Sequence, residues 1–138
     1  MTNKAAYECL MDHGVKPSVQ RIAIMDYLLK NRTHPTAEEI YSALVNLIPT
    51  LSKTTVYNTL KLFVEQGAAL MLTIDEKNVK FDAETNPHAH FLCRKCNRVY
   101  DLPLNQEQLS FCTELPGEFE MDEMSLYVRG VCRTCHGS

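Results

Sequence analysis

The stretch LSKTTVYNTLKLFVEQG, residues 51–67, decides how the first half of the chain is interpreted. Ser52 suits a helix N-cap and Gly67 suits a C-terminal stop, so a helix is predicted over residues 53–65. Apolar residues recur at helical spacing along one side, which we expect to be buried: Val56, Leu60, Phe63 and Val64. A different side carries only uncharged or basic residues: Thr54, Tyr57, Asn58 and Lys61. One face of this helix is therefore suited to a core and the other to a polyanion.

Helical spacing of apolar residues predicts three earlier helices, within residues 5–14, 17–31 and 34–48. The last of these has the signature of a capping box, with Thr36 followed three residues later by Glu39. Its expected apolar stripe is Ile40, Leu44 and Leu47.

A hairpin is predicted after these helices, because residues 69–82 form two apolar-rich segments around the turn sequence DEKN. Helices followed by a hairpin in this order are typical of a winged helix-turn-helix domain, in which helix 53–65 would enter a DNA major groove. A small helical bundle with a solvated polar face is the alternative that the pattern leaves open.

Charge is distributed unevenly along the chain. The net charge of −3 argues weakly against a nucleic-acid partner, but residues 1–64 carry seven Lys/Arg and five Asp/Glu, whereas residues 65–138 carry seven and twelve. Any polyanion is therefore expected to meet the N-terminal part. No apolar run approaches the ~20 residues that span a bilayer, and the first residues do not form a secretory signal. We expect a cytoplasmic protein with no membrane partner.

The second half predicts a small α+β module. The polar connector AETNPHA, residues 83–89, suggests a domain boundary, with one domain over residues 1–83 and the other over residues 84–138. Strands are expected at HFLC (90–93), RVYDL (98–102) and SLYVRGVC (125–132), and a helix at NQEQLSFCTEL (105–115). A module of roughly 50 residues needs a staple or a partner to be stable.

Two CxxC pairs can supply that staple. Cys93 and Cys96 are separated from Cys132 and Cys135 by 35 residues. Four thiolates fill a tetrahedral Zn²⁺ site, which is coordinatively closed and therefore structural. Unrelated buried cysteines or a redox pair are the alternatives, but a chain in a reducing compartment favours zinc. The remaining Cys9 and Cys112 are expected to be small core residues.

A second group of candidate ligands combines imidazoles and carboxylates. His88 and His90 are two residues apart, so on an extended segment both rings point the same way. Asp82 and Asp101 are the nearby carboxylates, and His34 precedes a helix, where neither packing nor capping explains it. Such a mixed N/O set suits Fe²⁺, Mn²⁺, Co²⁺, Ni²⁺ or Zn²⁺. Taken singly, each residue also has an ordinary interpretation as a solvated side chain.

The chain resembles the ferric uptake regulator family of bacterial metal-dependent repressors over nearly its whole length. The resemblance rests on six segments in the family's order: HPTAEEIY (34–41), LSKTTVYNTL (51–60), KFD (80–82), HAHFLCRKC (88–96), VYDL (99–102) and GVCRTC (130–135). It implies an N-terminal winged-helix DNA-binding domain and a C-terminal α/β dimerisation domain. It also implies a homodimer that represses transcription by binding an inverted-repeat operator in double-stranded DNA when a regulatory metal is bound.

The resemblance also assigns residues. It implies that the structural zinc ligands are Cys93, Cys96, Cys132 and Cys135. It implies that the regulatory ligands for Fe²⁺ or Mn²⁺ are His34, Asp82, His88, His90 and Asp101, of which His34 and His88 would be oxidation-sensitive. DNA contacts are expected from Lys16, Arg21, Ser52, Lys53, Thr54, Thr55, Tyr57, Asn58 and Lys61.

The peroxide-sensing repressor (PerR) branch is the one that the chain resembles most. Iron-sensing members commonly carry Glu at the positions of Asp82 and Asp101, and Arg at the position of Asn58. They often have a further metal site, but three of its four matching positions here, Pro87, Ala89 and Met124, offer no usable ligand.

Other functions compete with peroxide sensing. Within the family, an iron-responsive uptake regulator comes next and a zinc-uptake regulator is a weaker alternative. A non-haem iron enzyme also uses two histidines and a carboxylate, but it needs open coordination positions and a substrate pocket. We expect no enzyme and no small organic substrate. A zinc-ribbon interaction module without a regulatory metal is the third class.

Overall fold

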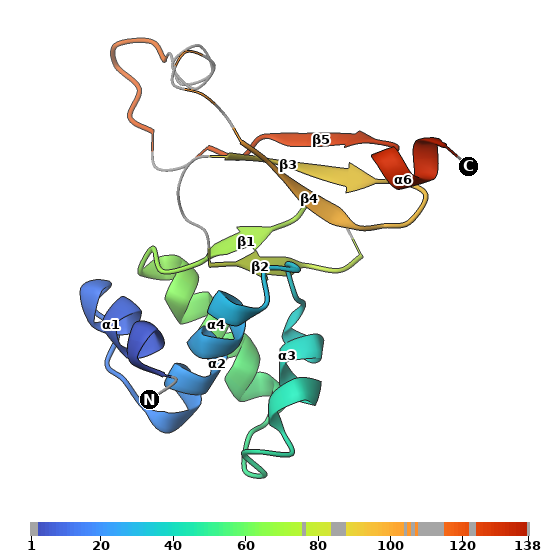
Figure 1. Ribbon diagram of the computed structural model, residues 1–138. Helices are drawn as coiled ribbons and strands as arrows, with labels where there is room; N and C mark the ends of the chain where they lie inside the picture. The colour runs from blue at the N-terminus through green and yellow to red at the C-terminus, as the bar shows by residue number, and fades with distance from the viewer. Residues whose placement is uncertain are drawn as a thin grey trace. The chain divides into compact units, whose positions relative to one another are not determined.

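Two units make up the chain, Met1–Thr85 and Asn86–Ser138, as a computed structural model shows (Figure 1). The structure describes residues 3–75, 77–83, 88–103, 105, 107, 115–121 and 124–137, with the backbone alone for His88.

The first unit contains four helices, in the order that the sequence predicts. They are α1 (Lys4–Asp12), α2 (Val19–Lys30), α3 (Ala37–Leu44) and α4 (Lys53–Glu65). Hydroxyl side chains cap three of them: Ser18, Thr36 and Ser52 each accept a hydrogen bond from the backbone N–H three residues later. Each cap satisfies one of the N–H groups that a helix start leaves without an intrahelical partner. The expected bounds of α4 are confirmed, because its sequence carries its own start and stop signals.

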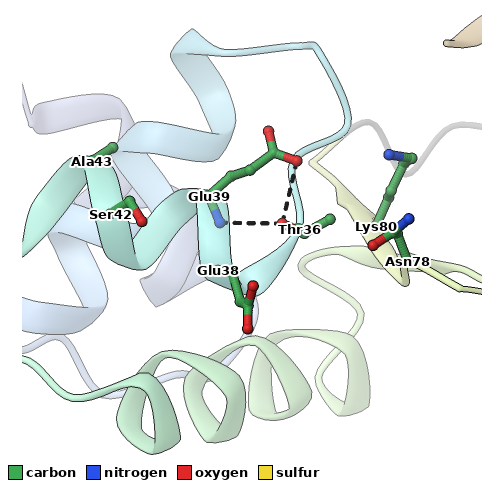
Figure 2. A pocket seen from close by; sticks show the side chains of 7 residues that line it. All are labelled: Thr36, Glu38, Glu39, Ser42, Ala43, Asn78 and Lys80. Carbon is green, nitrogen blue, oxygen red and sulfur yellow. Dashed lines mark hydrogen bonds between the residues drawn. The ribbon is translucent and has the colours of Figure 1, made fainter. Parts of the chain in front are cut away.

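The capping box before α3 is present in a modified form (Figure 2). The Thr36 hydroxyl accepts a hydrogen bond of 3.1 Å from the backbone N–H of Glu39 and donates one of 3.2 Å to the Glu39 carboxylate. The carboxylate therefore closes the box on the hydroxyl. The Thr36 backbone is used differently, as part of a bridge with Lys80.

The core of the first unit lies among the helices. It includes the fully buried side chains of Leu10, Ile24, Met25, Leu28, Ile40, Val56, Leu60 and Phe63. The predicted buried face of α4 is thus confirmed for three of its four residues, and Val64 is partly buried against the same core.

The expectation for Leu47 is wrong, because its side chain is 78% exposed. Helix α3 ends at Leu44, and the N–H groups of both Leu47 and Ile48 bond to the Leu44 carbonyl in the turn that follows. Helical spacing therefore no longer applies at Leu47, and Ile48 packs against the core instead.

A hairpin follows α4. Strands β1 (Leu70–Leu72) and β2 (Lys80–Asp82) pair antiparallel, with Leu70 opposite Asp82. The segment before α3 lies along the other edge of β2, where Phe81 N–H donates to the Pro35 carbonyl at 2.9 Å and Thr36 pairs with Lys80. This third extended segment holds the start of α3 against the hairpin.

The second unit is built on a three-stranded sheet of order β4-β3-β5. Its strands are β3 (His88–Cys93), β4 (Val99–Pro103) and β5 (Tyr127–Gly130), and a short helix α6 (Arg133–His136) follows. β3 pairs antiparallel with β4 and parallel with β5. At Gly130 a Cβ atom would lie 3.1 Å from the nearest Phe91 ring atom, so any other residue here would require the ring to shift by a few tenths of an ångström.

The helix predicted over residues 105–115 falls mostly outside the described residues. Within the described part of the chain, no helix is both long enough and apolar enough to cross a membrane.

We expect Leu60→Ala to lower the free energy of unfolding of the first unit by about 2–5 kcal/mol, because the leucine side chain is fully buried and its removal leaves a cavity. Chemical denaturation followed by circular dichroism measures this. Leu47→Ala is the matched control and should change stability by less than ~0.5 kcal/mol, since that leucine is exposed. Equal losses in the two variants would contradict the assigned core.

Candidate metal centres and nucleic-acid interface

Four cysteine sulfurs converge in the second unit. Cys93 ends β3, Cys96 lies in the following turn, Cys132 is the residue before α6 and Cys135 lies within that helix. Their sulfur atoms all lie within 4.8 Å of one another, and Cys96 Sγ is 3.8 Å from Cys132 Sγ. None of these cysteines is in a disulfide. The spacing of the two CxxC pairs predicted this cluster.

Local backbone geometry brings the sulfurs together. Asn97 adopts a left-handed conformation with φ of 63°, which turns the chain after Cys96, and its N–H donates to the Cys93 carbonyl at 2.8 Å. The second CxxC pair directly follows β5, whose last residue, Gly130, accepts a hydrogen bond of 2.8 Å from the Arg94 N–H. Parallel pairing of β3 with β5 thus delivers both CxxC pairs to the same end of the sheet.

The cluster favours negative charge on some sulfurs and opposes it on others. Backbone N–H groups of Cys96 and Cys132 point at Cys93 Sγ from 3.5 and 3.4 Å, and these hydrogen bonds lower the pKa of Cys93 to about 5. The pKa of Cys135 is instead raised to about 12, first by its hydrogen bond with Cys132 and then by burial. A divalent cation would remove this conflict, because it stabilises every coordinating thiolate. Four thiolates fit the donor set of a closed zinc site.

Tyr100, on β4, also contacts this cluster and was not predicted from the sequence. Hydrogen bonding with Cys132, and then burial, raises the pKa of Tyr100 to about 12. The sequence gives no sign of the contact, since a tyrosine in a strand is usually there for packing.

Two further cysteines, Cys9 and Cys112, remain. Cys9 is half-buried in α1, and burial raises the pKa of its thiol. The ring of His13, one turn later, donates a hydrogen bond from Nδ1 to the Cys9 carbonyl oxygen, 2.7 Å away. Cys112 lies outside the described residues.

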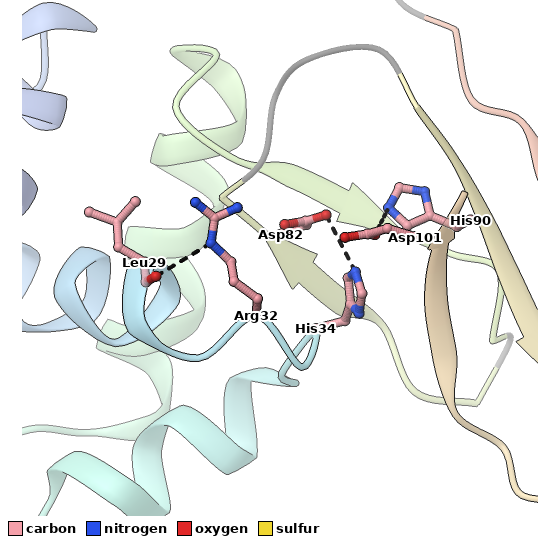
Figure 3. A network of polar contacts seen from close by, with 6 residues as sticks. All are labelled: Leu29, Arg32, His34, Asp82, His90 and Asp101. Carbon is pink, nitrogen blue, oxygen red and sulfur yellow. Dashed lines mark hydrogen bonds and ion pairs between the residues drawn. The ribbon is translucent and has the colours of Figure 1, made fainter. Parts of the chain in front are cut away.

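His34 and Asp82 form a buried pair in the first unit (Figure 3). Because Thr36 pairs antiparallel with Lys80, the residue two positions earlier faces the residue two positions later, and His34 is therefore brought opposite Asp82. His34 Nε2 lies 3.4 Å from Asp82 Oδ2, and both side chains are almost completely buried. His34 has a φ of 57°, a left-handed conformation that is uncommon outside glycine and asparagine.

His90 and Asp101 form a second cross-strand pair, within the second unit (Figure 3). They are directly opposite each other in the β3–β4 register, and His90 Nε2 lies 3.5 Å from Asp101 Oδ1. His90 is buried, and its ring makes an edge-type contact with Tyr127 at a centroid distance of 6.4 Å, whereas the Asp101 side chain is 42% exposed. His88 begins β3, and its side chain lies outside the described residues.

Each pair offers one imidazole nitrogen and one carboxylate oxygen. This donor chemistry fits a first-row divalent ion such as Fe²⁺ or Mn²⁺ and is distinct from the all-sulfur cluster. The four candidate ligands that lie among the described side chains thus form two pairs, one in each unit.

The exposed face of α4 is the candidate nucleic-acid interface. Thr54, Tyr57, Asn58 and Lys61 are all exposed, as their spacing predicts, and the Tyr57 side chain is 46% exposed. Lys61 Nζ lies 6.0 Å from the centre of the Tyr57 ring, which places a positive charge beside an aromatic surface.

The other residues expected to contact DNA lie at helix starts. Ser52 caps α4, since its hydroxyl accepts a hydrogen bond of 3.0 Å from the Thr55 backbone N–H; it also donates to the Thr55 hydroxyl at 2.8 Å. Lys53 stands 5.7 Å from the centre of the Tyr41 ring. Lys16 is exposed, and the Arg21 guanidinium donates to the Lys16 carbonyl at 2.8 Å.

Comparison with known proteins shows the family of the chain. Residues 12–128 match the sequence profile of the ferric uptake regulator family. The chain is 37% identical to the peroxide operon regulator of Bacillus subtilis over 134 residues, which cover 96% of this chain and 92% of that protein. It is 35% identical to the peroxide-responsive repressor PerR of Staphylococcus epidermidis, over 88% of this chain and 82% of that one.

Among solved structures, the ferric uptake regulator of Francisella tularensis with iron superposes with a TM-score of 0.70 at 25% identity, covering 89% of this chain and 96% of that chain. The profile match spans well over half of the chain, and both sequence relatives exceed 30% identity. The chain therefore belongs to the ferric uptake regulator family.

Proposed function

We propose that this protein is a metal-dependent, dimeric transcriptional repressor that binds an inverted-repeat operator and senses peroxide. The observation that carries the proposal is the pair of histidine–aspartate contacts, His34 with Asp82 and His90 with Asp101, in a chain whose relatives include peroxide-responsive repressors. Aspartate at both carboxylate positions is the pattern of the peroxide branch that the chain resembles. The proposed role is regulatory, with no catalytic turnover of a substrate.

The cysteine cluster would hold the structural zinc ion. All four sulfurs are close enough to share one ion, and the two hydrogen bonds to Cys93 Sγ keep that sulfur suited to the thiolate form. Because the ion would tie the turn after β3 to the residues after β5, its binding free energy would become folding free energy of the second unit.

The regulatory metal would be Fe²⁺ or Mn²⁺, bound by His34, Asp82, His88, His90 and Asp101. Support comes from the two nitrogen–oxygen pairs and from the family resemblance, which assigns all five residues to one ion. Shared ligation would link the two units and hold the DNA-binding units of a dimer at operator spacing. Bound Fe²⁺, unlike Mn²⁺ or Zn²⁺, supplies the reducing chemistry that activates hydrogen peroxide.

Peroxide would act on a ligand imidazole of His34 or His88. One peroxide oxygen is inserted into a ring C–H bond and the other leaves as water, so the histidine is oxidised while the peroxide is reduced. An oxidised ring is a poorer nitrogen ligand, and the link between the units would be lost. DNA affinity then falls because the two DNA-binding units are no longer held in register.

DNA recognition would use the exposed face of α4, with Tyr57 and Asn58 toward base edges and Lys61 toward a phosphate. The DNA backbone would be contacted by residues at the start of the same helix: Ser52, Lys53, Thr54 and Thr55. Lys16 and Arg21 would add contacts at the flank. The basic balance of residues 1–64 supports this orientation.

Operator binding should distinguish peroxide sensing from its alternatives. We expect both the Fe²⁺-loaded and the Mn²⁺-loaded protein to bind the operator, and only the Fe²⁺ form to lose affinity after peroxide. Mass spectrometry of the treated Fe²⁺ form should find one added oxygen atom on a peptide with His34 or His88. His90→Ala is the control and should bind the operator with neither metal, because it removes one of the two buried imidazoles.

Each alternative gives a different result in that experiment. Loss of DNA binding with unmodified histidine peptides would contradict ligand oxidation. A response to iron supply with no effect of peroxide would indicate an iron-responsive uptake regulator, and a response to zinc alone a zinc-uptake regulator. Turnover of an organic co-substrate would indicate a non-haem iron enzyme.

Cys96→Ser should remove the structural zinc, because serine is a hard oxygen donor that replaces one of the four thiolates. We expect the zinc content to fall from about one ion per chain and the second unit to lose its cooperative thermal transition. Cys9→Ser is the matched control, since that cysteine lies outside the cluster. A Cys96→Ser protein with full zinc content and unchanged unfolding would refute the structural-zinc assignment.

Tyr57→Ala should weaken operator binding by about 1–3 kcal/mol while changing non-specific DNA binding much less, because base contacts specify and phosphate contacts do not. Titrations with operator and with scrambled duplex at one salt concentration measure both. Tyr7→Ala, which removes a tyrosine of nearly equal exposure (47%) from α1, is the control. Parallel losses on both duplexes would argue against a role in sequence recognition.

A further inference from the structure

All lysine and arginine residues of the second unit belong to two short segments. Residues 86–138 contain five Lys/Arg and seven Asp/Glu, and every acidic residue falls between positions 101 and 123. The basic residues fall within 94–98 and 129–133, where no acidic residue occurs. Their side chains are all exposed, and together we call them the basic patch: Arg94, Lys95, Arg98, Arg129 and Arg133.

Backbone pairing brings the two segments together. The Arg94 N–H donates to the Gly130 carbonyl at 2.8 Å, which places Arg94 beside the residue that follows Arg129. The Cys93 N–H donates to the Arg98 carbonyl at 3.0 Å, so the turn after β3 folds back on the end of that strand. These two bonds hold three members of the basic patch at the end of β3.

The cysteine cluster brings the other two members to the same end of the sheet. Lys95 lies between the cysteines of the first CxxC pair, and Arg133 lies between those of the second. Because all four sulfurs lie within 4.8 Å of one another, the two turns that carry them are neighbours. Both turns lie at the end of the sheet toward which β3 and β5 run (Figure 1). The basic patch is therefore gathered in space although its members come from two parts of the chain.

Binding of zinc would not cancel the charge of the basic patch. Four thiolates around one Zn²⁺ leave a formal excess of two negative charges, which is fewer than the five positive charges of the patch. Asp101, the only acidic residue on the three described strands, faces His90 instead. Cations held close together create a positive potential that attracts anions. The basic patch is therefore suited to an anionic partner.

The chemistry of the two turns favours phosphate over a protein surface. Apart from the cluster's own cysteines, residues 94–98 and 133–137 carry only charged or polar side chains and one glycine. Protein–protein interfaces usually centre on apolar or aromatic anchors, which these turns lack. Contacts with a nucleic-acid backbone need only charged and polar donors. Four of the five members are arginines, whose guanidinium groups can bind a phosphate through two hydrogen bonds.

We propose that the basic patch is a second DNA-binding surface, which contacts phosphate groups of the duplex without reading its sequence. The inference rests on the proposed function for its DNA partner. Helix α4 would supply sequence recognition, and the basic patch would add affinity that depends on salt concentration. Binding through the patch would release counterions from the DNA in proportion to the number of phosphates it contacts.

The test is the salt dependence of DNA binding by the full-length, Mn²⁺-loaded protein, with an operator duplex and a random-sequence duplex as probes. Arg94→Gln combined with Arg133→Gln removes one cation from each CxxC turn. We expect the slope of log affinity against log salt concentration to fall in magnitude by about two on both duplexes, because each lost phosphate contact removes roughly 0.9. The ratio of operator affinity to random-duplex affinity should not change. Fluorescence anisotropy titrations at several salt concentrations measure both quantities.

A second variant and a control of matched charge accompany this one. Lys95→Gln combined with Arg98→Gln should lower the slope in the same way, and the zinc content of both variants should equal that of the unsubstituted protein. Lys4→Gln combined with Lys30→Gln is the control, since it removes the same charge from exposed positions of the first unit that have no assigned DNA contact. We expect the control to leave the slope unchanged.

The outcomes separate this inference from the proposed function. Unchanged slopes in both patch variants would overturn the role of the basic patch and leave operator recognition by α4 standing. An equal fall in the control would also overturn it, because net charge alone would then explain the effect. Loss of binding to poly-L-glutamate with an unchanged DNA slope would overturn it in favour of an acidic protein partner. If the unsubstituted protein bound the operator no more tightly than the random duplex, the proposed repressor function would be refuted, whereas a smaller slope in the patch variants would still support the basic patch.

Discussion

The convergence of four sulfurs at one end of a three-stranded sheet is the constraint on which the second unit depends. Two parallel strands cannot be joined by a short turn, so the chain reaches β5, beside β3, only through a long connection. The hydrogen bonds of the sheet alone stabilise that connection weakly. Shared ligation of an ion would hold the ends of that connection. Such an ion would therefore support the register of β3 against β4 and β5, and with it the position of His90.

Cross-strand pairing gives the histidines their carboxylate partners. His90 is opposite Asp101 in a regular ladder, and His34 is brought opposite Asp82 by a bridge only one pair long. Cross-strand pairing thus places a carboxylate beside a histidine in both units. A regular strand ladder holds the pair in the second unit, and a single bridge holds the pair in the first. The left-handed backbone at His34 adds to the difference, because it places the ligand in a conformation that the neighbouring pairing must maintain.

Local signals in the sequence were enough for much of this architecture. The bounds of α4 follow from Ser52 and Gly67, because helix capping and termination by a glycine with positive φ depend on only a few neighbouring residues. The CxxC spacing predicts the convergence of the sulfurs for the same reason. Leu47 was misassigned because periodicity does not say where a helix ends. The contact of His34 with Asp82 depends on strand register, and that of Tyr100 with Cys132 depends on the fold of the sheet, so neither could be derived from spacing alone.

Gly130 makes the choice of residue at one position depend on distant ones. Its missing side chain leaves the space that the Phe91 ring occupies, and that ring lies 6.5 Å from the ring of Tyr100 on β4. A larger residue at position 130 would require the Phe91 ring to shift by a few tenths of an ångström. A substitution at this position of β5 is therefore expected to act on β3 through the packing of the Phe91 ring.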